Sequence, residues 1–243
     1  MKKFFIIFVL ILSFVSCEKS QPKKKTFNYP ESKVWKHGVY SKHTAKELEG
    51  VFDGLEVDVI YSPEIDNIFI GRSIKDTVHK FYLDSWFAYL DEPSKMAFWV
   101  DFKNLTAENA EGAFVVLDTI SKRYNIKNRM FVESRDIEAL MIGKKKDFFT
   151  MLWVDNIYWS KLDTASLMQK IRSQIEYLQP DAISCEYRMF PLLCDTFPEQ
   201  NIHFWDTPKK YTPENVEFTQ KICRNKSVKA VLVDYPTPII NIF

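Results

Sequence analysis

Two carboxylates one residue apart interrupt an apolar segment of this 243-residue chain, in the run Gly-Leu-Glu-Val-Asp-Val-Ile-Tyr at residues 54–61. In a β-strand, residues i and i+2 point to the same face, so Glu56 and Asp58 project together. Burying two like charges side by side is costly unless a cation, a proton or hydrogen bonds compensate them. The pair therefore predicts a metal site. The alternative is an exposed edge strand with one polar face.

Polar side chains also end the other apolar runs. Asp101 and Lys103 repeat the i, i+2 spacing in Trp-Val-Asp-Phe-Lys, residues 99–103. The further candidates at the ends of such runs are His37, Glu133, Asp155, Glu186, Trp205, Asp206 and Asp234. For Asp155, Asp206 and Asp234 taken singly, a helix cap or a solvated loop residue is the simpler explanation. The whole set predicts a site at the carboxyl ends of parallel strands.

The elements that must position these side chains alternate between short apolar runs and segments of helical periodicity. Predicted strands cover residues 34–37, 55–61, 97–102, 129–133, 149–153, 182–185, 202–205 and 230–234. Predicted helices cover residues 44–52, 85–90, 107–124, 136–146, 164–178, 190–197 and 213–223. A small hairpin with its turn at residues 63–67 extends the second strand. Eight strands alternating with helices predict an α/β fold, a single-domain (β/α)8 TIM barrel, with a doubly wound sheet as the alternative.

The beginning of the chain has the pattern of a secretory signal. Two lysines precede an apolar run at residues 4–15, which is too short to span a membrane comfortably, and Ser16 and Cys17 follow. A cysteine at this junction resembles the processing site of bacterial lipoproteins, which implies lipidation of Cys17 and anchoring in the bacterial cell envelope. We expect a signal peptide at residues 1–16, a lipid-anchored tether at 17–30 and the barrel at 31–243. An ordinary cleaved signal or an uncleaved anchor is the alternative.

Charge and cysteine content exclude several classes of function. The net charge is +1 with both signs dispersed, so we expect no nucleic-acid partner. The four cysteines lack the short spacings of zinc sites and disulfide scaffolds, and both a single disulfide and free thiols remain open. The chain also lacks a Gly-rich phosphate loop. We expect a monomer.

The order and spacing of these motifs resemble a known family. His37, the run at residues 54–59, the Asp-Phe-Lys at 101–103 and the Val-Asp-Tyr-Pro at 233–236 are similar to the landmarks of glycerophosphodiester phosphodiesterases. That family belongs to the phospholipase C-like phosphodiesterase superfamily of TIM barrels. The resemblance implies that His37 is a catalytic acid or base and that Lys103 acts beside it. It also implies that Glu56, Asp58 and Asp101 bind a divalent cation, Ca²⁺ or Mg²⁺, which suits hard oxygen ligands.

Two positions depart from the family pattern. Gly38 follows His37 where the family has an arginine, and residues 70–73 read Ile-Gly-Arg-Ser where a second histidine is expected. Arg72 can bind a phosphate oxygen, but its very high pKa prevents it from acting as an acid or base near neutral pH. His79 is a distant candidate to replace that histidine, whereas His203 is better explained as a core residue.

Two functions from different classes therefore stay open. The first is a metal-dependent phosphoric diester hydrolase that acts on glycerophosphodiesters or related phospholipid-derived headgroups. We expect its substrate to contact Arg72, Glu133, Glu186 and Trp205, and Trp153, Tyr158 or Trp159 to form a wall of the cleft. The second is a catalytically impaired barrel that binds a phosphorylated ligand or an envelope partner. A glycosidase is a weaker reading, because two acids one residue apart do not straddle a glycosidic bond well.

Overall fold

A computed structural model describes residues 26–238 and shows the predicted barrel. Eight parallel strands close on themselves through the pairing of β1 with β2, and β3 adds an antiparallel strand to the far part of β2. The strands are β1 (Val34–Lys36), β2 (Gly54–Ser62), β3 (Asn67–Ile70), β4 (Ala97–Phe102), β5 (Met130–Ser134), β6 (Phe149–Trp153), β7 (Ala182–Glu186), β8 (Ile202–Trp205) and β9 (Val228–Val233). The β2–β3 pair is the predicted hairpin.

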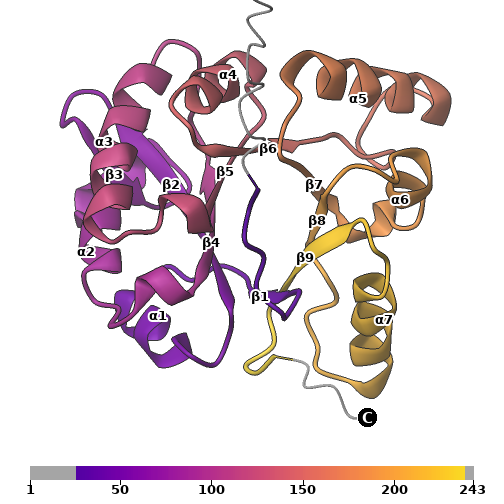
Figure 1. Ribbon diagram of the computed structural model, residues 1–243, viewed down its shortest axis with the longest axis horizontal. Helices are drawn as coiled ribbons and strands as arrows, with labels where there is room; N and C mark the ends of the chain where they lie inside the picture. The colour runs from indigo at the N-terminus through magenta and orange to yellow at the C-terminus, as the bar shows by residue number, and fades with distance from the viewer. Residues whose placement is uncertain (1–25, 239–243) are drawn as a thin grey trace, which may run out of the picture.

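Helices surround the barrel in the described part of the chain (Figure 1). They are α1 (Lys42–Leu48), α2 (Leu83–Phe87), α3 (Ala110–Arg123), α4 (Ile137–Lys145), α5 (Thr164–Leu178), α6 (Leu192–Thr196) and α7 (Pro213–Cys223), with 3-10 turns η1 (Ile74–His79), η2 (Pro93–Lys95), η3 (Lys127–Arg129) and η4 (Tyr187–Met189). The prediction of helix following strand is confirmed, with boundaries that differ by a few residues. Among residues 26–238, no helix combines the length and the apolar character needed to cross a bilayer.

Strand register decides which side chains fill the barrel. Parallel pairing places Asp58 beside Asp101 and Asp101 beside Glu133, so these three lie in one layer. One layer below, Glu56 stands beside Trp99, and Trp99 beside Phe131. Because side chains alternate along each strand, residues two apart share the inner face. The acidic layer therefore stands directly on an aromatic one.

An aromatic cluster fills the barrel below the acidic residues. Trp35, Trp99, Phe131 and Phe149 belong to this cluster and are almost completely buried. Gly54 makes room for it, because a Cβ at this position would lie 2.2 Å from Cδ2 of Trp35. The bottom of the cavity is thus a tightly packed floor rather than an open channel.

The domain begins earlier than predicted. Phe27 is 6% exposed and its ring lies 4.2 Å from that of Phe131, while the Tyr29 hydroxyl lies 3.0 Å from Nε2 of His203. In Figure 1 this segment runs as an indigo trace across the middle of the molecule. Residues 27–30 of the predicted tether are therefore part of the packed domain, because their aromatic rings find apolar partners. The predicted signal at 1–16 and Cys17 lie outside the described residues.

The cysteines that the structure describes do not pair. Cys185, Cys194 and Cys223 are free thiols. Cys185 lies on β7 and is fully buried, and burial raises its thiol pKa. These residues behave as small apolar side chains of the core.

Candidate active site

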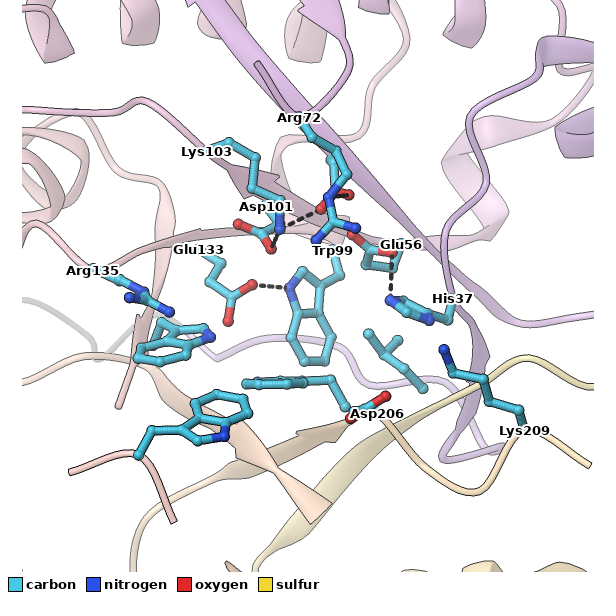
Figure 2. A pocket seen from close by; sticks show the side chains of 15 residues that line it. His37, Glu56, Arg72, Trp99, Asp101, Lys103, Glu133, Arg135, Asp206 and Lys209 are labelled. Atoms are coloured by element: carbon cyan, nitrogen blue, oxygen red, sulfur yellow. Dashed lines mark hydrogen bonds and ion pairs between the residues drawn. The ribbon is translucent and has the colours of Figure 1, made fainter. Parts of the chain in front are cut away.

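Strand ends and following loops on one side of the barrel surround a cavity of about 390 Å³. Its lining residues are His37, Glu56, Asp58, Arg72, Trp99, Asp101, Lys103, Glu133, Arg135, Trp153, Trp159, Trp205, Asp206, Lys209 and Leu232. Figure 2 shows His37 and Glu56 on one side of this cavity and Arg135 on the other, with Glu133 between them. The volume falls in the range of about 300–1,000 Å³ that small-molecule sites use.

Three carboxylates meet at the wall formed by β2 and β4. Each of Glu56, Asp58 and Asp101 offers one oxygen, and these oxygens lie within 4.8 Å of one another. Glu56 and Asp58 are only 2% and 3% exposed although both are ionisable. Burial and the neighbouring Asp58 and Asp101 raise the pKa of Glu56 well above its usual value. Hard oxygen donors held this closely, with their charge incompletely compensated, fit a divalent cation such as Ca²⁺ or Mg²⁺.

Lys103 links two of these carboxylates. Its Nζ lies 2.5 Å from Oδ1 of Asp58 and also bonds Oδ2 of Asp101. Burial lowers the pKa of Lys103, but Asp101 and Asp58 outweigh it and raise the pKa overall. The side chain is therefore a fixed positive charge at the cavity wall, where it can attract a phosphate oxygen.

Tyr40 and Arg72 hold the second oxygen of Asp58. The Tyr40 hydroxyl donates to Oδ2 at 2.5 Å, and Arg72 Nε lies 3.2 Å from the same atom. Arg72 comes from the segment after β3 and lines the cavity. It occupies the segment in which the family resemblance implied a second histidine. His79 lies in η1, stacked on Phe81, and does not line the cavity.

His37 follows β1 and is fixed on both sides. Its Nδ1 lies 2.9 Å from Oδ1 of Asp234, the residue after β9, and its Nε2 lies 3.9 Å from Oε2 of Glu56. The hydrogen bond to His37 lowers the pKa of Asp234. A carboxylate at Nδ1 selects the tautomer with hydrogen there, which leaves the Nε2 lone pair facing the cavity.

Gly38 makes the turn that places this histidine. Its φ of +66° is unfavourable for residues with a side chain. The turn directs the Gly38 backbone N–H to Oε2 of Glu56 at 2.7 Å, and the Val39 N–H to the Glu56 carbonyl at 2.9 Å. Gly38, at the position where the family has an arginine, contacts the Glu56 carboxylate through its backbone N–H. It adds no positively charged side chain to the site.

Glu133 lines the cavity but is held by neighbours. Trp99 Nε1 donates to its Oε2 at 2.7 Å, and the Ser184 hydroxyl donates to its Oε1. Burial and the nearby Asp101 raise its pKa well above the usual value. The proton on this carboxyl is therefore held more tightly than on an exposed glutamic acid.

Glu186 lies outside the cavity lining. It is fully buried, and its Oε1 accepts from Arg188 Nε at 2.5 Å. Its other oxygen lies 3.5 Å from Nδ2 of Asn156. Asn156 in turn accepts from the backbone N–H groups of Tyr158 and Trp159. The contacts of Glu186 therefore support the loop after β6, rather than presenting a carboxylate to the cavity.

The opposite wall is aromatic. Trp205 lies there as predicted, together with Trp153 and Trp159, and Tyr158 stands outside. Sequence reasoning missed Arg135, Lys209 and Tyr40. Arg135 follows Glu133 with the same i, i+2 spacing that relates Asp58 to Glu56 and Lys103 to Asp101, so that rule could have found it. Lys209 and Tyr40 lie in loops with no comparable pattern.

Comparisons with known proteins support the fold but leave the family unassigned. No protein-family model and no curated protein sequence matches the chain. A solved glycerophosphodiester phosphodiesterase from Parabacteroides distasonis superposes with a TM-score of 0.61 and 12% identity, over 86% of this chain and 95% of that one. An Oleispira antarctica phosphodiesterase, solved with its product sn-glycerol-3-phosphate, gives 0.63 and 14% over 87% and 95%.

A protein of another kind shares the same architecture. The glycerol uptake operon antiterminator regulatory protein of Listeria monocytogenes gives a TM-score of 0.54 and 12% identity, over 85% of this chain and 94% of that one. Identities this low establish shared architecture, and function must be argued from the site. The chain has the fold of the glycerophosphodiester phosphodiesterases, as its motifs predicted.

Proposed function

We propose that this protein is a metal-dependent phosphoric diester hydrolase that acts on glycerophosphodiesters or related phospholipid-derived headgroups in the bacterial cell envelope. The observation that carries the proposal is His37, oriented by Asp234, with its Nε2 lying 3.9 Å from Oε2 of Glu56, one of the three clustered carboxylates. Phosphodiester cleavage requires a base, a cation and positive charge near the phosphate. One cavity of this protein holds a candidate base, carboxylates that suit a cation, and a lysine.

In this proposal the described residues divide the work. Glu56, Asp58 and Asp101 hold the cation, which when bound neutralises charge on the phosphate oxygens. Lys103 and Arg72 bind phosphate oxygens beside it. Nε2 of His37 takes a proton from the attacking water as the new P–O bond forms and the P–O bond to the leaving alcohol breaks.

The leaving oxygen must gain a proton when its bond to phosphorus breaks. Arg72 stands where the family has a histidine, and it keeps its own proton near neutral pH. In the proposed reaction the proton therefore comes from water at the mouth of the cavity. Esters of acidic alcohols, whose leaving group needs no proton, are then the better substrates.

The test is hydrolysis of bis(p-nitrophenyl) phosphate and of glycerophosphocholine by the full chain, with Ca²⁺, Mg²⁺ or chelator. We expect metal-dependent turnover that is faster on the nitrophenyl ester. His37→Ala should reduce kcat by about 10²–10⁴-fold, as loss of a general base does. Glu56→Gln should abolish the metal-dependent turnover while the circular dichroism spectrum stays unchanged. Turnover that persists in both variants contradicts the proposal.

The absence of a histidine at Arg72 favours a second function, a barrel that binds a phosphorylated ligand or an envelope partner without cleaving it. Its signature is sn-glycerol 3-phosphate binding, measured by calorimetry, with no hydrolysis of either ester. If neither ester is hydrolysed but Ca²⁺ or Mg²⁺ raises the melting temperature, the cation site is intact and the protein does not catalyse the reaction. Any hydrolysis that depends on His37 rules this function out.

A further inference from the structure

The half of the cavity opposite His37 is formed by three tryptophans. Ring centroids are 5.8 Å apart for Trp153 and Trp205, 5.8 Å for Trp159 and Trp205, and 6.4 Å for Trp153 and Trp159. The three planes lie within 13–29° of one another. Separations of about 4.5–7 Å are those of offset rings, so the stack leaves parts of the ring faces uncovered.

The stack is built into the fold. Trp153 ends β6 and Trp205 ends β8. Trp159 comes from the loop after β6, and that loop is fixed by Asn156, whose Oδ1 accepts from the Trp159 backbone N–H at 3.1 Å. Asn156 is only 1% exposed. Trp159 itself is 55% exposed, so it offers apolar surface at the mouth of the cavity without losing its anchor.

The charges around the stack decide which ligand it suits. The Arg135 guanidinium carbon lies 3.3 Å from the centre of the Trp153 ring, so a cation already covers that face. Within residues 26–238, neither Arg135 nor Lys209 forms an ion pair with a carboxylate, and both line the cavity. A quaternary ammonium on the Trp153 face would meet the guanidinium of Arg135, whereas the Glu133 and Asp206 carboxylates line other parts of the same cavity. A flat, neutral or anionic group on that face does not meet a like charge.

One polar atom of the stack lacks a protein partner. Nε1 of Trp205 is buried and makes no hydrogen bond with the described residues. Because this atom is not exposed to the cavity, it is not the group that a ligand would meet. The donors available at this wall are the guanidinium N–H groups of Arg135, which can bond the hydroxyl oxygens of a ligand that also has an apolar face.

We propose that the wall of Trp153, Trp159, Trp205 and Arg135 binds the alcohol moiety of the substrate, and that this moiety is a ring polyol, a sugar or cyclitol, rather than a choline or ethanolamine headgroup. The C–H face of such a ring packs on the indoles, and its hydroxyl groups accept from Arg135. The inference rests on the proposed phosphodiesterase function, because it places the phosphate between this wall and His37.

The test compares glycerophosphodiesters that differ in the alcohol alone: glycerophosphoinositol, glycerophosphoglycerol, glycerophosphoethanolamine and glycerophosphocholine. We expect the highest kcat/KM for the inositol ester. Trp159→Ala should raise KM for this ester about tenfold, as loss of an aromatic contact does, and should raise KM for the choline ester much less. Tyr158→Ala is the matched control. Tyr158 is the exposed residue before Trp159 in the chain, contacts Arg188 and does not line the cavity.

A second measurement does not depend on turnover. Calorimetry with inositol 1-phosphate and glucose 1-phosphate on the His37→Ala protein should show binding that Trp159→Ala weakens about tenfold. If no ester is cleaved but this binding and its loss are found, the subsite stands and the hydrolase function fails. If all esters are cleaved equally, or Trp159→Ala affects all of them alike, the subsite is wrong and the hydrolase function stands.

Discussion

His37 and Asp234 illustrate how individual residues acquire a possible chemical role in this protein. They lie 197 positions apart in the chain, yet Oδ1 of Asp234 meets Nδ1 of His37 at 2.9 Å because β1 and β9 are neighbours in the barrel. Taken alone, Asp234 looked like an ordinary loop residue. Its contact with His37 makes it a positioning residue, because it acts on the imidazole and does not line the cavity.

Replacing this carboxylate tests that role. Asp234→Asn removes the charge that selects the His37 tautomer, so we expect kcat on bis(p-nitrophenyl) phosphate to fall tenfold or more while KM changes little. The matched control is Asp155→Asn, which breaks an exposed ion pair with Lys170 outside the cavity. Equal kcat values in the two variants contradict a role for Asp234.

At the scale of elements, the segment before β1 acts as part of the barrel. Phe27 packs at the centre of the aromatic cluster, 4.2 Å from Phe131 and 5.1 Å from Phe149. Tyr29 continues the contact by bonding His203. Phe27 and Tyr29 pack against the aromatic cluster that lies below the acidic residues. The folding stability of the barrel under the site therefore depends on this segment.

Truncation of Phe27 measures this link. Phe27→Ala should lower the free energy of unfolding by about 3 kcal/mol, the cost of removing a large buried ring, in urea titration followed by circular dichroism. Phe81→Ala is the control, because Phe81 is 61% exposed and its loss should cost at most about 0.5 kcal/mol. If residues 17–30 were only a flexible tether, Phe27→Ala and Phe81→Ala would both change the free energy of unfolding by the same small amount.

At the scale of the whole molecule, the barrel encloses a histidine that cannot take up a proton easily. His203 lies among Trp35, Trp99 and Phe131, with ring centroids 4.9–5.7 Å away. Burial, assisted by Lys229, lowers the pKa of His203 from 6.5 to about 3. The unfolded chain binds this proton below pH 6.5 and the folded chain does not, so acid favours unfolding.

This difference gives a defined pH window. Between pH 6.5 and about 3, the unfolding free energy of the wild type should fall relative to that of His203→Gln by up to about 1.4 kcal/mol per pH unit. Above pH 6.5 the difference should stay constant. Urea titrations of both proteins at several pH values measure it, and NMR titration of the His203 ring gives the pKa directly. Parallel curves across the window contradict a buried neutral histidine.

Local spacing along the chain was enough to predict some parts of this protein. Strand–helix alternation indicated the barrel, and the i, i+2 rule identified Glu56 with Asp58 and Asp101 with Lys103, because side-chain direction along a strand follows from parity alone. Which strand ends lie next to one another became clear from the tertiary structure, because it depends on how the barrel closes. Barrel closure joined His37 to Asp234, stacked Trp153, Trp159 and Trp205 beside Arg135, and placed Phe27 in the floor. Glu186 contacts its near neighbour Arg188 and the distant Asn156, and it does not line the cavity. The position of a carboxylate at a strand end therefore does not show whether it meets the cavity or the surrounding loops, because this depends on which side chains the folded barrel brings next to it.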